Sequence, residues 1–184
     1  MDEQLLVTAC LKGNRESQKH LYERFAPRML GVCYRYAHTR EEAEDFLQEA
    51  FITVFRKLHQ YRNEGSLEGW IYRITVHTSL NCIKARYPID ESLDPTELTQ
   101  LKTPTVLQDG HGEKDLLTLV RSLPDGYRTV FNLYAIEGYS HDEIGQLLGI
   151  KPATSRSQYT RARELLMKKL GSDYPENKKG GNNG

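Results

Sequence analysis

Apolar residues recur at helical spacing in several separate stretches of the chain, which is the pattern of amphipathic helices. The first stretch is residues 1–12, and it places Leu5, Leu6 and Ala9 on one side of a short helix. A second, longer helix is predicted to reach about His38. The sequence therefore begins with two consecutive helices.

The strongest periodic signal covers residues 40–61, where one face is lined by Ala43, Leu47, Ala50, Val54 and Leu58. Thr39 and Glu42 stand in the spacing of a capping box, which predicts where this helix begins. A polar loop at residues 62–66 and a further helix over residues 67–86 follow. Four helices of this kind can close a small bundle.

A second helical unit is predicted from Glu113, with a helix over residues 125–137 that Gly138 ends. The stretch 139–166 then reads as a helix, a tight turn and a second, longer helix. A short connection between two helices is the arrangement of a helix-turn-helix.

Local signals mark the boundaries inside residues 139–166. Ser140 and Glu143 form a second capping box, Gly149 can adopt the left-handed backbone that ends a helix, and Pro152 suits the first turn of the next one. The second helix has an inward stripe at Ser155, Tyr159, Ala162 and Leu166. Its opposite rows are basic and polar, with Arg156, Ser157, Thr160, Arg161 and Lys168. In a DNA-binding helix-turn-helix, the first residues of this second helix would enter the major groove of DNA. The alternative is an ordinary helical hairpin with a solvated basic face.

Residues 88–112 interrupt the helical pattern with prolines, glycines and an excess of acidic side chains. This composition predicts a flexible acidic linker, because about 25 residues without periodicity is long for a surface loop within one domain. Residues 172–184 hold little that could pack, so we expect a disordered tail. The predicted fold is all-α, with two small helical domains over residues 1–87 and 113–171 joined by a flexible linker, the second ending in the helix-turn-helix.

The composition of the chain limits which partners and compartments are expected. The 25 Lys and Arg balance 25 Asp and Glu, so the chain is no polycation and its own affinity for DNA is expected to be modest. Cys10, Cys33 and Cys82 form no C-x-x-C, so neither a disulfide framework nor a zinc site is indicated. We expect a cytoplasmic protein without membrane insertion, since the sequence has no signal-peptide pattern and no apolar run of about 18 residues.

Motifs in both units carry a resemblance to a known family. The first unit contains AEDFLQEAFITVFRKLHQY and GSLEGWIYRITVHTSLNCIKAR. The second contains LPDGYRTVFNLYAIEGYSHDEIGQLLGIKPATSRSQYTRARELL. In this order, over residues 5–171, they resemble sigma factors of the sigma-70 family, of the short extracytoplasmic function (ECF) type.

The resemblance implies a promoter-specificity subunit of bacterial RNA polymerase. The first domain would bind core polymerase and open the −10 element, and the second would bind the −35 element. Promoter DNA, core RNA polymerase and an anti-sigma factor are the implied partners. No cofactor or metal is implied, and an enzyme is not expected, because the sequence has no H-E-x-x-H motif and no Gly-rich phosphate loop.

The resemblance also assigns site residues. Those for core polymerase are Asp45, Gln48 and Glu49, which lie on one helix face. Those for the −10 element are Arg62, Asn63, Glu64, Ser66, Trp70, Arg73, His77 and Asn81, with Arg86 as a further candidate for a phosphate. Those for the −35 element are Thr154, Arg156, Ser157, Gln158, Thr160 and Arg161.

Four positions depart from the family pattern, and each raises an expectation. His77 stands where relatives often have Asn, and Gln158 replaces a common Arg, so base preference cannot be transferred from relatives. Ser155 replaces a buried Val and weakens the inward stripe. Gly145 replaces Ala inside a helix, at a cost of up to about 1 kcal/mol.

Two other functions fit parts of the sequence. A free-standing helix-turn-helix regulator would explain residues 139–166 but not the acidic helix face or the loop at residues 62–66. A sigma-like adaptor would bind polymerase without melting DNA. Dependence on core polymerase tests the first alternative, and DNA melting tests the second.

Overall fold

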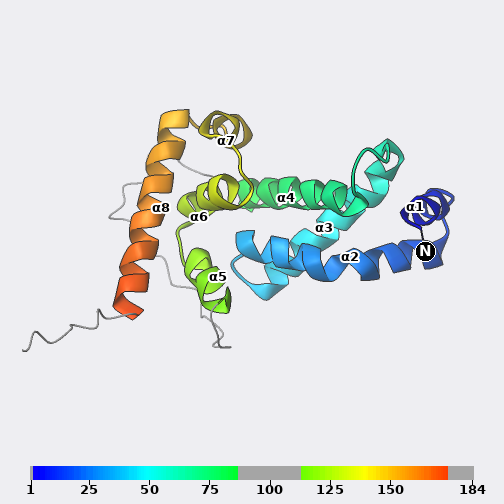
Figure 1. The fold of residues 1–184 in the computed structure, drawn as a ribbon, viewed down its shortest axis with the longest axis horizontal. Coiled ribbons are helices and arrows are strands. Elements are labelled where there is room, and N and C mark those ends of the chain that lie inside the picture. Colours follow the sequence, from blue (N-terminus) through cyan, green and yellow to red (C-terminus); the bar gives the residue numbers. More distant parts are fainter. Residues whose placement is uncertain (1, 87–112, 174–184) are drawn as a thin grey trace, which may run out of the picture. The chain divides into compact units, whose positions relative to one another are not determined.

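The computed structural model describes residues 2–86 and 113–173, and all regular structure in these two ranges is helical (Figure 1). The chain divides into two compact units, Met1–Ile89 and Asp90–Gly184. The predicted all-α fold with two helical units is confirmed. The predicted linker, residues 88–112, lies outside the described residues. Helix α8 continues to Asp173 and so includes the first two residues of the predicted tail, and the rest of the tail also lies outside the described residues.

Unit 1 consists of α1 (Glu3–Leu11), α2 (Arg15–Tyr36), α3 (Arg40–Lys57), the 3-10 turn η1 (Leu58–Gln60) and α4 (Leu67–Arg86). Helices α2, α3 and α4 each pack against the other two. Their shared core buries large apolar side chains from all three helices, including Leu21, Phe25, Met29, Phe46, Leu47, Ile71 and Ile83. This burial of amphipathic faces is what closes the bundle.

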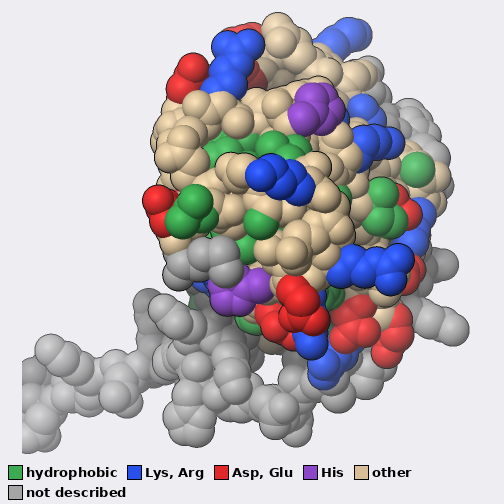
Figure 2. All heavy atoms as spheres, turned by 90° about the vertical axis from the view of Figure 1, so that its right-hand side faces the viewer, with side chains coloured by type: hydrophobic (Ala, Val, Ile, Leu, Met, Phe, Trp, Pro, Cys, Tyr) green, Lys and Arg blue, Asp and Glu red, His purple; other side chains and the backbone are tan. Residues whose placement is uncertain are grey.

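The inward face of α1 differs from the predicted one. Leu6, Val7 and Cys10 are buried, whereas Leu5 is 64% exposed. The helix is apolar on more than one side, so the spacing of its leucines did not determine which side packs. Figure 2 looks at the side of unit 1 where α1 lies and shows hydrophobic side chains exposed between charged ones.

Helix α3 begins at the predicted cap, but the capping box is only half formed. Thr39 Oγ1 accepts from Glu42 N at 3.1 Å. The Glu42 carboxylate reaches one residue further back and accepts from His38 N at 2.6 Å. Because Glu42 is 7% exposed, its carboxylate is fixed at the corner between α2 and α3.

Unit 2 consists of α5 (Glu113–Arg121), α6 (Asp125–Phe131), the π-helical turn η3 (Asn132–Ile136), α7 (His141–Leu148) and α8 (Pro152–Asp173). Figure 1 shows α8 as the long helix of this unit, and α5, α6 and α7 all contact it. One cluster of its core joins Val120, Leu123, Tyr127, Ala162 and Leu166. The predicted interruption at Leu123 and Pro124 separates α5 from α6.

The helix predicted over residues 125–137 is not uniform. After Phe131 the backbone widens into η3, where Glu137 N donates to Asn132 O at 3.0 Å across five residues. The next turn closes through Tyr139 N and Leu133 O, also at 3.0 Å. A π-turn is rare and has no sequence signal of its own, so periodicity predicts a continuous α-helix here.

The helix-turn-helix begins and turns at the predicted residues, but α8 runs to Asp173 and not to residue 166. Ser140 and Glu143 form the complete capping box, and Gly149 ends α7 with φ 73°. The amides of Gly149 and Ile150 both donate to Gly145 O, at 2.9 and 3.1 Å. A Cβ built on Gly145 would lie 2.8 Å from Ile150 O. The expectation that glycine costs up to about 1 kcal/mol relative to alanine at position 145 left out this contact, because a Cβ there would force the turn to shift.

Candidate nucleic-acid interface

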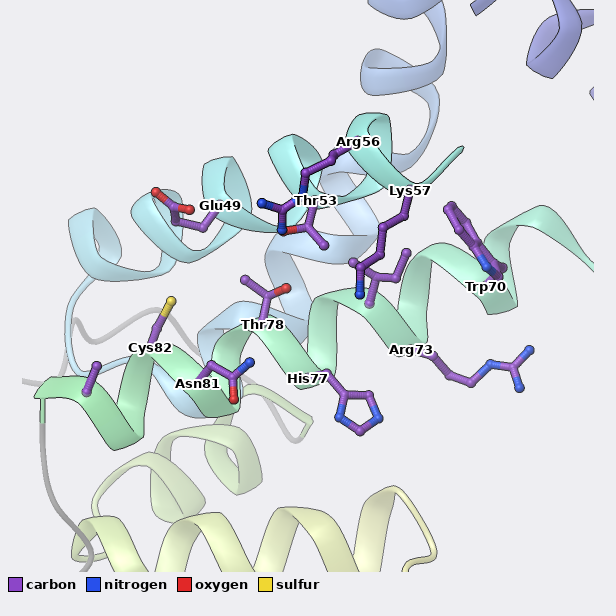
Figure 3. A pocket seen from close by; sticks show the side chains of 12 residues that line it. Glu49, Thr53, Arg56, Lys57, Trp70, Arg73, His77, Thr78, Asn81 and Cys82 are labelled. Carbon is purple, nitrogen blue, oxygen red and sulfur yellow. The ribbon is translucent and has the colours of Figure 1, made fainter. Parts of the chain in front are cut away.

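A groove of about 600 Å³ lies between α3 and α4 in unit 1 (Figure 3). Residues from α3 line one side, and Trp70, Arg73, His77 and Asn81 line the other. These four were predicted separately for the −10 element, and the fold brings them together along one helix. Glu49, predicted for polymerase, lies at the opposite end of the groove from Trp70.

The groove carries more positive than negative charge. Arg56, Lys57 and Arg73 line it, against the single carboxylate of Glu49. Figure 3 shows the Lys57 side chain extending from α3 toward α4. Arg56 Nη2 lies 3.5 Å from Thr53 Oγ1, a long contact that leaves the guanidinium available for other acceptors. Cations beside an aromatic ring and amide or imidazole groups suit a single nucleic-acid strand.

Sequence reasoning missed Arg56 and Lys57. Both lie in the last turn of α3, where basic residues commonly complement the helix dipole. The resemblance assigned Asp45, Gln48 and Glu49 from the same motif but neither of these cations. Their position opposite Trp70 depends on how α3 packs against α4, which the sequence does not show.

Trp70 is neither a core residue nor a free ring. It is half-buried, and its ring centroid lies 5.6 Å from that of Tyr61 at an interplanar angle of 54°. One side of the indole is thus supported within unit 1, while the residue also lines the groove. The role of Trp70 at the −10 element stays a prediction.

The polar loop predicted at residues 62–66 precedes α4 and is exposed throughout. Asn63 has φ 60° and Gly65 has φ 102°, so the chain turns sharply. Ser66 begins α4: its Oγ accepts from Gly69 N at 3.0 Å, and its carbonyl accepts from Trp70 N at 3.2 Å. The loop side chains Arg62, Asn63 and Glu64 are not among the groove-lining residues.

The residues predicted for polymerase share an exposed face of α3, as expected for Asp45, Gln48 and Glu49. Arg86 joins this face rather than a DNA-facing one. Its Nη2 donates to Asp45 Oδ2 at 3.1 Å, and its Nη1 donates to Glu42 Oε1 at 3.2 Å. The hydrogen bond to Asp45, followed by that to Glu42, raises the pKa of Arg86. The structure therefore argues against the phosphate contact expected for Arg86.

The start of α8 presents the predicted polar surface. Arg156, Ser157, Thr160 and Arg161 are exposed, and Thr154 is half-buried. The two hydroxyls bond to their own helix, Ser157 Oγ to Thr154 O at 3.0 Å and Thr160 Oγ1 to Arg156 O at 3.1 Å. Arg161 Nη1 lies 3.2 Å from Glu164 Oε2 in an exposed pair, which contributes little to stability.

Gln158 is placed differently from its neighbours in α8. A Cβ on Gly126 of α6 would lie 3.3 Å from Gln158 Nε2, so the amide packs against α6. Its Oε1 is buried and has no hydrogen-bond partner among the described residues. This placement favours a packing role and argues against the predicted DNA contact.

Ser155 has a partner that its sequence position did not suggest. It is fully buried, and its Oγ lies 2.9 Å from His141 Nδ1 at the start of α7. The His141 ring stacks on Tyr134 with centroids 4.3 Å apart, and Tyr134 in turn contacts Tyr159. Burial, followed by the nearby Arg156, lowers the pKa of His141. The polar residue in the inward stripe thus ties α7 to α8.

Comparison with known families matches both units. Residues 21–87 match the family described as sigma-70 region 2, and residues 113–166 match sigma-70, region 4. No described helix is long and apolar enough to cross a membrane.

Individual proteins agree with these matches. The chain is 34% identical over 155 residues to the ECF RNA polymerase sigma factor SigE of Mycolicibacterium smegmatis, covering 82% of this chain but 60% of that protein. It is 27% identical over 182 residues to the ECF RNA polymerase sigma-E factor of Haemophilus influenzae, covering 92% of this chain and 96% of that protein.

A solved structure has a similar fold. It is the sigma factor RpoE of Bartonella quintana in complex with the anti-sigma factor NepR, with a TM-score of 0.53, 17% identity and coverage of 85% of this chain and 98% of that one. Taken with the two region matches, in the order in which the sequence motifs predicted them, these likenesses show that the chain belongs to the sigma-70 family, as an RNA polymerase sigma factor of the ECF type.

Proposed function

We propose that this sigma factor divides promoter recognition between its two units, with residues 1–87 opening the −10 element and residues 113–171 binding the −35 element. The observation that carries the first assignment is the groove between α3 and α4, where Trp70, His77 and Asn81 meet three cations. Stacking and hydrogen-bonding groups beside positive charge are what a single strand requires.

In this proposal the melted strand follows α4. Lys57 and Arg73 contact phosphates, Trp70 stacks on a base, and His77 and Asn81 meet base edges along the same helix. The loop at residues 62–66 takes up an unstacked base beside the Trp70 end. Unstacking costs a few kcal/mol, so a receiving pocket is needed to make opening favourable.

An exposed polar face of α3 supplies the polymerase contact. Asp45, Gln48 and Glu49 form a compact polar patch that suits a basic surface on core polymerase. Arg86 holds Asp45 at one edge of this patch, whereas Gln48 has an exposed side chain in its middle. We expect Gln48 to lie inside the contact.

The start of α8 supplies the −35 contact. Arg156 and Arg161 are the cations that can read a guanine edge or bind phosphates, with Thr154, Ser157 and Thr160 as shorter polar groups beside them. Gln158 is left out because its amide packs on α6.

An anti-sigma factor is proposed as a third partner. The Bartonella quintana sigma factor of similar fold was solved with one, and the sequence resemblance implied the same class of partner. We place the protein in the cytoplasm, where core polymerase works, and assign no catalytic step to either unit.

The test is co-elution with purified bacterial core RNA polymerase on a sizing column. Wild type is expected to co-elute, and Gln48→Arg to be lost from the complex because it adds a positive charge to the acidic patch. Gln4→Arg, the same change on an exposed residue of α1, is the matched control and should behave as wild type. Failure of the wild-type chain to bind core polymerase, with its helix content intact, would favour a free-standing helix-turn-helix regulator.

A further inference from the structure

Tyr61 spans the loop at residues 62–66 from one end to the other. It follows η1, and its hydroxyl donates to Gly65 O at 2.7 Å. The same oxygen lies 3.2 Å from Asn63 Oδ1. A phenol has one proton, and the shorter distance assigns it to the Gly65 carbonyl. The Tyr61 side chain thus connects the residue that precedes the loop with Gly65, near the end of the loop.

The loop has little else to hold its shape. Asn63 has a positive φ of 60°, which residues with a side chain adopt at a cost, and Gly65 follows at φ 102°. All five loop residues are exposed, so no packing against the core fixes them. A backbone of this kind keeps one conformation only where specific contacts hold it.

The other end of the Tyr61 side chain is fixed. Its ring contacts the Trp70 ring at a centroid distance of 5.6 Å, and Tyr61 N donates to Leu58 O at 3.1 Å. Burial, with a smaller contribution from Glu3, raises the pKa of the Tyr61 phenol, so it remains a donor at neutral pH. The loop is thereby tied to the aromatic end of the groove.

We infer that Tyr61 is a positioning residue whose hydroxyl holds the loop at residues 62–66 in the conformation that receives an unstacked base. Ordering the loop costs conformational entropy. If the loop is already ordered before DNA binds, the opening step does not include this cost. The inference rests on the proposed function of the loop in −10 opening. It assigns Tyr61 no contact with DNA.

The first experiment needs no DNA. Trypsin cleaves after Arg62, which lies inside the loop, so the rate of cleavage at this bond reports how tightly the loop is held. Tyr61→Phe keeps the ring contact with Trp70 and removes only the hydroxyl. The matched control is Tyr72→Phe, because the Tyr72 hydroxyl accepts from Arg35 Nη2 at 2.8 Å within the same unit but away from the loop. Cleavage after Arg62 should be faster in Tyr61→Phe alone.

The second experiment measures promoter opening. Core polymerase with the wild-type chain first selects a fragment from a randomised DNA pool, and the rate of opening of that fragment is followed with permanganate, which oxidises unpaired thymines. Loss of one hydrogen bond predicts about a three- to tenfold slower opening for Tyr61→Phe. Tyr72→Phe, which loses a comparable bond in unit 1, should open the fragment at the wild-type rate.

The outcomes separate the inference from the proposed function. Faster cleavage together with slower opening, both confined to Tyr61→Phe, supports the positioning role. Slower opening without faster cleavage, or faster cleavage without slower opening, overturns it, as do equal effects in Tyr72→Phe, which would reflect general loss of stability. A wild-type chain that selects and opens no DNA removes the proposed function, and the inference with it.

Discussion

Arg86 at the end of α4 donates through Nη2 to Asp45 Oδ2 on α3 across 3.1 Å, so the proposed polymerase patch is built partly by a residue outside it. The same guanidinium bonds to the buried Glu42 and lies 5.2 Å from the centre of the Phe46 ring. Arg86 therefore joins the last turn of α4 to the first turns of α3.

Replacing Arg86 is expected to destabilise unit 1. Arg86→Met leaves Glu42 buried without its cation, which should lower the free energy of unfolding by about 1–2 kcal/mol. Arg40→Met removes an exposed i,i+4 pair with Glu44 and should cost no more than about 0.5 kcal/mol. Urea titration followed by the fluorescence of Trp70, the single tryptophan, reports unit 1 directly. Equal effects of the two changes would mean that the Arg86 contacts stabilise nothing beyond an ordinary surface pair.

Glycine to alanine changes are expected to have opposite effects in two helices. Gly145→Ala places a Cβ 2.8 Å from Ile150 O and should destabilise unit 2 by about 1–3 kcal/mol, since the turn must shift. Gly31→Ala, in α2, meets nothing within 4 Å and should stabilise unit 1 by up to about 1 kcal/mol. Circular dichroism on heating measures both. A stabilising Gly145→Ala would refute the close approach at the turn.

The case of Gly145 shows where sequence patterns stop being informative. Helix boundaries at Ser140, Gly149 and Pro152 depend on local chemistry, and these were predicted correctly. The cost of alanine at Gly145 depends on the carbonyl of Ile150, which lies five residues away across the turn. Helix propensity scales do not include the geometry of such a turn. The π-turn after Phe131 escaped prediction for a similar reason, because no local signal distinguishes it from α-helix.

In the candidate site, too, the sequence motifs predicted individual residues but not how helix packing brings them together. The motifs named Trp70, Arg73, His77 and Asn81 without showing that they line one groove. Arg56 and Lys57 enter that groove only through the packing of α3 on α4, and the inward turn of Gln158 depends on the nearby Gly126. The domain boundaries and the residue roles remain predictions.

The pKa of His141 predicts a pH dependence of unit 2. Burial and Arg156 lower it in the folded chain, whereas Asp142 acts in the opposite direction. The unfolded chain therefore binds a proton more readily, so the contribution of His141 to stability is full above the ordinary pKa of about 6.5 and is lost as the pH falls below it.

Two measurements check this sign. Nuclear magnetic resonance titration should give His141 a pKa below the ordinary value of about 6.5. His141→Phe keeps an aromatic ring over Tyr134, and its stability should fall less than that of the wild type between about pH 7.5 and pH 5.5. An ordinary or raised pKa for His141 would contradict the prediction.

Arg156 and Gln158 are two residues apart in α8 and should behave differently toward DNA. The affinity of core polymerase with this chain is measured at several salt concentrations, on a duplex fragment that the same complex has selected. If Arg156 binds a phosphate, Arg156→Ala should reduce the number of ions released on binding by about one. It should instead cost about 1–3 kcal/mol at one base pair if it reads guanine. Gln158→Ala should change neither quantity. A larger DNA effect from Gln158→Ala than from Arg156→Ala would reverse the assignment of faces on α8.

Opening of duplex DNA by core polymerase with this chain tests the central claim most directly. On a fragment selected from a randomised pool, permanganate should find a continuous stretch of reactive thymines only when the chain is present. Lys57→Gln should retain the fragment but reduce this reactivity, because Lys57 lies in the groove proposed for the melted strand. Lys12→Gln, at an exposed position just after α1, should match the wild type. A wild-type complex that stays on the fragment with every thymine protected would contradict the account and identify an adaptor that binds polymerase without melting DNA.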